Sequence, residues 1–264
     1  MNFNKIGEIF TNNGDFILAG IISTLILSIF GTVVGLILGV FLAYGKNIKV
    51  KELDNKFIKA LKVILRGFCS IYSIVLRGTP MMVQALIFKY GCLAICINFE
   101  NIIFPKEIIN VINGWLIAGL IVITLNTAAY MGEIVQSGLN GVDKGQVEGA
   151  RSLGMSARSA SLKIILPQAL RNALPTIGNE FIVNIKDSSV LNVITVTELY
   201  YRMKDIASTN YAFLECYFIL ALIYLVMTLI ASLVLKLIEK KLDGEKISLN
   251  PFGRLKRSYD LWVK

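Results

Sequence analysis

A row of polar side chains interrupts an otherwise apolar segment in the middle of the chain. Asn126, Tyr130 and Glu133 follow at intervals of four and three residues, so on a helix they share one face. That face could bind an ammonium group or another cation. Arg77, or a backbone amide freed near Thr79, could bind a carboxylate. Lipid would penalise such groups, so we expect these five residues to line a path for a polar solute.

Ion pairs between helices are the alternative explanation for the charged side chains. Arg77, Glu133, Lys186 and Asp187 could form such structural pairs between spans. A paired charge inside a membrane bundle needs no substrate to justify it. The sequence leaves both roles open for Arg77 and Glu133 and favours the structural role for Lys186 and Asp187.

Catalytic and metal-binding chemistry has little support in the sequence. Histidine is absent, which removes histidine-based triads, metal motifs and general bases. Two of the four cysteines lie one helical turn apart, but no second pair accompanies them. We therefore expect no bound metal and no catalytic site, and assign all four as small buried side chains: Cys69, Cys92, Cys96 and Cys216.

The sequence also lacks a loop that could hold nucleotide phosphates. The nearest match ends at Lys46, but Val40 stands where the first glycine is required, and Asn47 where Ser or Thr is required. Uphill transport would need a separate ATPase as its source of energy. ATP and Mg²⁺ would then be held by that partner, and this chain would bind no cofactor.

Composition indicates an integral membrane protein. Of the 264 residues, 55% are hydrophobic and 17% are charged, against roughly a quarter charged in soluble domains. A membrane helix needs about 20 apolar residues. We assign one transmembrane domain, residues 1–264. Its five predicted spans cover 16–44, 60–90, 113–137, 173–196 and 212–237. The second of these spans is expected to break near Thr79.

The net charge of +9 is distributed as membrane topology requires, not as a nucleic-acid-binding patch. The connections 46–62 and 139–171 and the tail from Lys236 together hold 19 Lys and Arg residues, against 4 in the alternate connections. This asymmetry predicts an amino terminus outside the cell and a carboxy terminus in the cytoplasm. An odd number of spans agrees with that orientation.

A polar, basic segment between two apolar ones predicts a docking surface on the cytoplasmic loop 139–171. Residues 148–153 can form a short helix, and Gly154 suits the left-handed position that ends it. Ser156 can cap a second helix, and we expect Pro167 to redirect the chain. Periodicity alone also allows an alternative, a surface helix that lies on lipid headgroups.

This loop resembles the signature loop of ABC importer permease subunits. The shared residues are Glu148, Gly149, Ala150, Gly154, Ile164, Leu166 and Pro167. Gly149 stands where the family usually has alanine, but glycine is also a small residue. The resemblance implies coupling helices that sit in a groove of the ATP-binding subunit, with contacts from Glu148, Gly149, Ala150, Arg151, Leu153 and Gly154.

Further motifs resemble the polar-amino-acid branch of these permeases. They occur in the family's order, as Arg77-Gly78-Thr79-Pro80, Val83-Gln84, Ala129 to Ile134, Lys144-Gly145-Gln146, Leu166 to Ala169, Gly178-Asn179 and Lys186 to Ser189. The branch implies an all-α, five-span fold of the type I ABC importer class in a bacterial cytoplasmic membrane. It also implies pairing with a second permease, identical or homologous.

The resemblance implies the transmembrane subunit of an ATP-driven importer for a polar amino acid, not an enzyme. Its partners would be ABC ATPase subunits, an extracytoplasmic solute-binding protein and membrane lipid, but no nucleic acid. Transport would proceed by alternating access. The alternative is an ATP-independent amino-acid channel or an ion-coupled carrier, neither of which needs the docking loop. The shared motifs do not choose between basic and acidic cargo.

Overall fold

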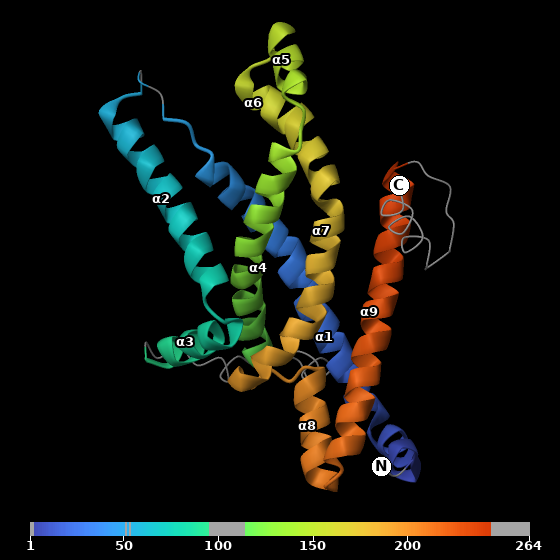
Figure 1. Ribbon diagram of the computed structural model, residues 1–264. Coiled ribbons are helices and arrows are strands. Elements are labelled where there is room, and N and C mark those ends of the chain that lie inside the picture. Colours follow the sequence, from blue (N-terminus) through green and yellow to red (C-terminus); the bar gives the residue numbers. More distant parts are fainter. Residues whose placement is uncertain (1–2, 51, 53, 95–113, 244–264) are drawn as a thin grey trace, which may run out of the picture.

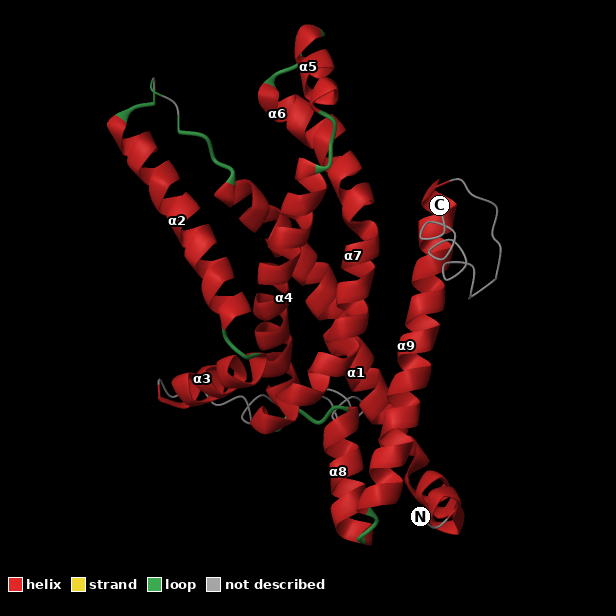
Figure 2. Cartoon of the chain, in the orientation of Figure 1, coloured by secondary structure: helices red, strands yellow, loops and turns green. Residues whose placement is uncertain are grey.

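The computed structural model describes residues 3–50, 52, 54–94 and 114–243, and in these ranges every regular element is a helix (Figure 2). The predicted all-α class is confirmed. Three of the described helices are long and apolar enough to cross a membrane: α1 (Phe3–Lys46), α4 (Gly114–Asn140) and α9 (Phe213–Asp243). They contain most of the first, third and fifth predicted spans. Most of the connection 91–112 and the tail beyond 243 lie outside the described residues.

The first helix begins well before the predicted span 16–44. Asn13 interrupts its regular backbone (φ −125°, ψ 16°), and the Asn13 side-chain amide donates to the carbonyl of Ile9 over 3.1 Å. α1 therefore consists of a short N-terminal segment and a long apolar helix. The short segment packs beside α8 (Leu199–Asn210), where Ile9 is buried.

The predicted second span is two helices, not one. α2 (Lys56–Gly78) ends at the expected break, and α3 (Met81–Ala94) then runs across the foot of the bundle (Figure 1). Thr79 is extended (ψ 145°), because the ring of a following proline disfavours helical geometry at the residue before it. The 14 residues of α3 rise only about 21 Å, which is short of a bilayer core.

The predicted fourth span, 173–196, also has different bounds. α7 (Leu166–Asp187) begins seven residues earlier, and a 3₁₀ helix, η3 (Ser188–Ile194), follows it. Thr195 then ends η3 in the left-handed conformation (φ 65°). Residues 173–187 of this predicted span are therefore α-helical as expected, and the rest of the span is not.

α1 and α4 approach each other closely at two glycines of α1. Gly35 and Gly39 lie one turn apart and both face α4. A Cβ at Gly39 would lie 2.5 Å from the Cβ of Met131, and one at Gly35 would lie 2.9 Å from Cγ2 of Thr127. Small residues at such spacing let membrane helices pack backbone to backbone.

A buried amide joins three helices at the centre of the bundle. Asn184 of α7 donates to the hydroxyl of Thr32 on α1 over 2.9 Å and accepts from the hydroxyl of Thr127 on α4 over 3.0 Å. All three residues are buried. Because each polar group has a partner, the contact fixes the three helices without an unsatisfied group.

The helix α8 forms a hairpin with α9 at the end of the molecule opposite α5 (Figure 1). Glu198 caps α8 by accepting from the backbone amides of Tyr200 (2.9 Å) and Tyr201 (2.8 Å), and it also accepts from the hydroxyl of Tyr224 (3.0 Å). Burial raises the pKa of Glu198 to about 7. We had expected only a connection between spans here.

Candidate functional site

Glu133 of α4 joins cations from two other helices. Its Oε1 atom lies 2.5 Å from Lys46 Nζ on α1 and 3.0 Å from Arg77 Nη1 on α2. The guanidinium carbon of Arg77 also lies 5.8 Å from the ring centre of Tyr130. These four residues, the polar cluster, carry one net positive charge. The side chains of Arg77 and Glu133 are 42% and 39% exposed, so both remain accessible.

Gln84 organises a second polar group at the break between α2 and α3. Its amide nitrogen donates to the carbonyls of Leu76 (2.8 Å) and Thr79 (2.9 Å) and to the Thr79 hydroxyl (2.9 Å). Its amide oxygen accepts from Asn126 of α4 over 2.9 Å. Gln84 therefore replaces backbone hydrogen bonds that the break removes and ties the break to α4.

The five residues predicted to line a path fall into these two groups. Arg77, Tyr130 and Glu133 belong to the polar cluster, while Thr79 and Asn126 lie at the helix break. The ion pair between Arg77 and Glu133, which the sequence left open, is present. Whether these residues contact a substrate stays a prediction.

Two residues beside the predicted path were not among its candidates. The sequence indicates Lys46 as a charge that flanks a span and as the end of an incomplete phosphate-loop match, and it indicates Gln84 as part of a motif. In the part of the chain that the structure describes, Lys186 and Asp187 take part in no ion pair, so the structural role favoured for them stays a prediction. They lie at the end of α7, where η3 begins.

Two short helices form a hairpin that stands at one end of the bundle (Figure 1). Asp143 caps α5 (Lys144–Ser152) by accepting from the amide of Gly145, and α6 (Ala157–Ala160) follows. Gly154 has the predicted left-handed backbone (φ 78°), and Ser156 caps α6 by accepting from the amide of Ser159 over 3.2 Å. Both local predictions are confirmed. We call residues 144–160 the coupling hairpin.

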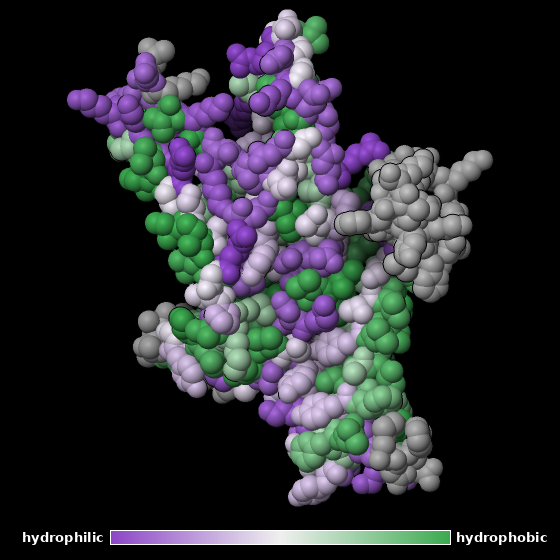
Figure 3. All heavy atoms as spheres, in the orientation of Figure 1, coloured by the Kyte–Doolittle hydropathy of each residue, from purple (hydrophilic) through white to green (hydrophobic). Residues whose placement is uncertain are grey.

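The coupling hairpin presents most of the residues predicted to contact an ATPase. Leu153 is 85% exposed, and Glu148, Gly149, Arg151 and Gly154 are exposed as well. Ala150 is buried within this chain, so its side chain is not presented. Hydrophilic side chains gather at this end of the molecule (Figure 3), which suits a surface in water.

The chain does not turn at Pro167, contrary to expectation. It continues from α6 through a π-helical turn, η2 (Ser161–Ile165), directly into α7. Pro167 lies in the first turn of α7, where its missing N–H is tolerated. The coupling hairpin is thus joined to α7 by continuous helix.

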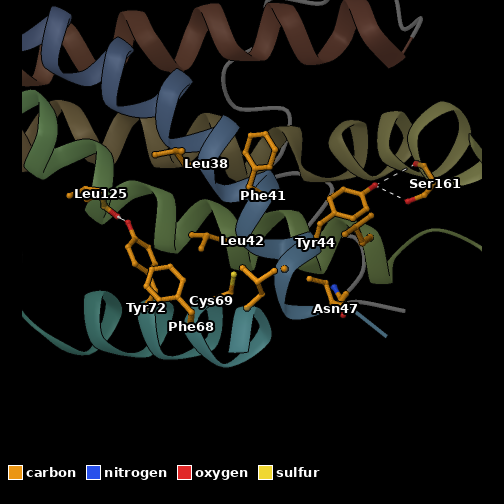
Figure 4. Close-up of a pocket in the computed structure, with 14 residues that line it drawn as sticks. Leu38, Phe41, Leu42, Tyr44, Asn47, Phe68, Cys69, Tyr72, Leu125 and Ser161 are labelled. Carbon is orange, nitrogen blue, oxygen red and sulfur yellow. Dashed lines mark hydrogen bonds between the residues drawn. The ribbon is translucent and has the colours of Figure 1, made fainter. Parts of the chain in front are cut away.

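An apolar cavity of about 870 Å³ lies between the end of α1, α2 and α4 (Figure 4). Its wall is mostly aliphatic and aromatic, with few polar groups. Tyr44 and Ser161 meet at one side of it, and Tyr72 closes another side by donating to the carbonyl of Leu125 over 2.7 Å. The described residues contain no cluster of potential metal ligands.

Residues 57–244 match the family described as binding-protein-dependent transport system inner membrane component. The matched range holds the coupling hairpin, the helix break and three of the four residues of the polar cluster. The chain belongs to this family. The resemblance to ABC importer permeases that the motifs predicted is thereby confirmed.

Relatives with transport names match nearly the whole chain. The arginine transport system permease protein ArtQ of Bacillus subtilis is 33% identical over 229 residues, which is 87% of this chain and 93% of the relative. A putative glutamine transport system permease protein GlnP of Rickettsia typhi is 31% identical over 227 residues, covering 86% and 93%. The similarity therefore extends well beyond the coupling hairpin.

Solved structures share the fold. A chain from a crystal structure of an amino acid ABC transporter with histidines is 34% identical, with a TM-score of 0.72 over 88% of this chain and 96% of that one. A chain of the methionine ABC transporter MetNI, in an inward facing conformation, is 16% identical with a TM-score of 0.61 over 85% and 93%. The second likeness concerns the fold alone.

Proposed function

We propose that this permease brings a polar amino acid into the cell, driven by ATP hydrolysis in a separate subunit. The coupling hairpin carries the proposal. It stands clear of the bundle, and Leu153 at its tip is 85% exposed, as expected of a surface that a partner covers. A channel or ion-coupled carrier would need no such hairpin.

The proposed topology has five spans in the bacterial cytoplasmic membrane. α1, α4 and α9 cross the membrane by themselves, while α2 and α7 cross as helices with polar faces that other subunits or water cover. The basic connections and the coupling hairpin then lie in the cytoplasm, and α8 lies outside. The two ends of the bundle in Figure 1 would face opposite sides of the membrane.

The polar cluster and the helix break are proposed as the chain's part of the substrate path. An amino acid presents a carboxylate and an ammonium group. Arg77 can offer paired N–H groups to a carboxylate, while Glu133 is already shared between two protein cations. The relatives named for glutamine and arginine and the structure with histidines agree with a polar amino acid as cargo.

Alternating access requires further subunits. We infer two ABC ATPase subunits that hold ATP and Mg²⁺, a second permease that completes the path, and a solute-binding protein that delivers the amino acid. The family description, which names a binding-protein-dependent system, supports the last of these. This chain would then be a transporter subunit and not itself an enzyme.

Charge reversal on the coupling hairpin tests the proposal. We expect Glu148→Lys to reduce co-purification of the ATPase subunit and to abolish uptake, because a reversed charge at a small interface loses its pairing and adds repulsion. The control is Lys5→Glu, which reverses the charge of an exposed side chain at the other end of the molecule and should leave co-purification of the ATPase normal. Normal assembly and uptake in Glu148→Lys would remove Glu148 from the docking surface.

A further inference from the structure

The last turn of α1 contacts two different parts of the molecule. Residues 44–46 of α1, together with Asn47 directly after it, are called the α1 terminus. On one side, the hydroxyl of Tyr44 lies 2.9 Å from the hydroxyl of Ser161 on η2. On the other side, Lys46 donates to Glu133, and the side-chain amide of Asn47 donates to that of Gln136, both on α4. The α1 terminus therefore links the segment after the coupling hairpin to the polar cluster.

Ser161 is well placed to follow movements of the coupling hairpin. It begins η2, the π-helical turn that continues directly from α6 into α7. Single π-helical turns are less regular than α-helix and occur often at functional positions. A shift of the hairpin therefore reaches Ser161 through continuous backbone, and Tyr44 is the side chain that binds Ser161 from α1.

The surroundings of this contact do not hold it in place by packing alone. Tyr44 and Ser161 both line the apolar cavity of about 870 Å³, and Figure 4 shows the Tyr44 ring directed toward Ser161 at its edge. Both residues are only partly buried. With open space beside the pair, the hydrogen bond and not a close-packed interface determines whether the α1 terminus moves with η2.

We propose that the α1 terminus transmits movement of the coupling hairpin to the polar cluster, and that the hydrogen bond between Tyr44 and Ser161 is the contact that makes this possible. Tyr44 is thus a positioning residue that acts through Lys46, two residues further along the same helix. The inference rests on the proposed function, since it requires an ATPase that moves the hairpin.

The test compares variants that differ by one hydroxyl group. Tyr44→Phe removes the phenol hydroxyl and with it both contacts to Ser161. Ser161→Ala removes the 2.9 Å contact between the two hydroxyls and leaves the carbonyl of Ser161, which lies 3.5 Å from the Tyr44 hydroxyl, while Ser161→Thr keeps a hydroxyl. Tyr211→Phe removes a hydroxyl from a side chain that is 85% exposed and serves as the control. Each permease is assembled with its ATPase in proteoliposomes, and amino-acid uptake and ATP hydrolysis are measured together.

We expect uptake per ATP hydrolysed to fall about threefold to tenfold in Tyr44→Phe and Ser161→Ala, the range that one lost hydrogen bond supports. Co-purification of the ATPase should stay normal. The double variant should be no worse than Tyr44→Phe alone, because that change already removes the whole contact. Ser161→Thr and Tyr211→Phe should retain the wild-type ratio.

An unchanged ratio in both Tyr44→Phe and Ser161→Ala would overturn the inference while leaving the proposed function intact. If Tyr44→Phe assembles poorly, the comparison of Ser161→Ala with Ser161→Thr decides the question. Uptake by the wild type that needs no ATP would overturn the proposed function and the inference together.

Discussion

Arg77, rather than Glu133, is the charged side chain of the polar cluster that we expect to meet a substrate, because its guanidinium has donors beyond the one that binds Glu133. The Glu133 oxygen is shared by Arg77 and Lys46, so a substrate ammonium would have to displace a protein cation. A carboxylate would instead meet the accessible guanidinium. The ion pair could be foreseen because both partners stand in recognisable motifs. The contact between Lys46 and Glu133 could not be foreseen, because 87 residues separate the two and the direction of the Lys46 side chain depends on how α1 packs.

Neutralising the shared carboxylate tests the structural side of the cluster. Glu133→Gln leaves Lys46 and Arg77 without their common acceptor, and the partial exposure of the pairs limits the loss to about 1 kcal/mol. We expect the Tm of the purified permease to fall by about 2–4 °C. The double change Glu133→Gln with Arg77→Gln should recover part of the loss, since one stranded cation is removed.

Thermal unfolding in detergent measures both variants, with Glu148→Gln on the exposed coupling hairpin as the control. A Tm of Glu133→Gln equal to that of the wild type would show that the ion pairs contribute nothing to stability.

At the scale of the elements, local turn chemistry was predictable and helix continuity was not. The break at Thr79 and the left-handed Gly154 follow from a proline and a glycine that restrict or free the backbone nearby. The prediction that the chain turns at Pro167 was wrong, because a proline in the first turn of a helix is compatible with helical structure. Nothing in the local sequence reveals that η2 continues into α7. Hydropathy likewise missed α8, whose fit depends on the buried Glu198.

The close contact between α1 and α4 at Gly39 predicts that an alanine there lowers the stability, and Gly67 provides a matched control. Gly39→Ala places a Cβ within 2.5 Å of Met131 and should force α1 and α4 apart, costing about 1–3 kcal/mol. At Gly67 of α2 a Cβ would meet nothing within 4 Å, so Gly67→Ala should be neutral or slightly stabilising, by up to about 1 kcal/mol. In thermal unfolding, the Tm of Gly39→Ala should therefore fall, and the Tm of Gly67→Ala should stay the same or rise. Equal stability of the two variants would contradict the close packing of α1 against α4.

For the whole molecule, the motifs predicted the family, and the resemblance implied the all-α class; the family is confirmed, and so is the all-α class in the described residues. The three most apolar spans could be located because lipid demands long hydrophobic helices. The other two were poorly bounded because charged residues such as Arg66 and Lys186 lower their hydropathy. The five-span count and its orientation therefore remain predictions.

Two equally exposed positions at opposite ends test the orientation. Tyr211 and Leu153 are each 85% exposed, the first beside α8 and the second on the coupling hairpin. After the four native cysteines are replaced, an impermeant thiol reagent applied to intact cells should label Tyr211→Cys and spare Leu153→Cys. Permeabilised cells, in which both should react, provide the control. The reverse labelling pattern would mean that the topology is inverted.

Dependence of uptake on ATP distinguishes the proposed importer from a passive channel. The permease is reconstituted with its ATPase, its second permease and its solute-binding protein in proteoliposomes, and uptake of labelled glutamine, arginine and histidine is measured against a concentration gradient. We expect accumulation of at least one of them with ATP and Mg²⁺, and none with ADP or with the Glu148→Lys permease. Equal uptake with and without ATP, ending at equal concentrations on both sides, would contradict this expectation and favour a passive channel.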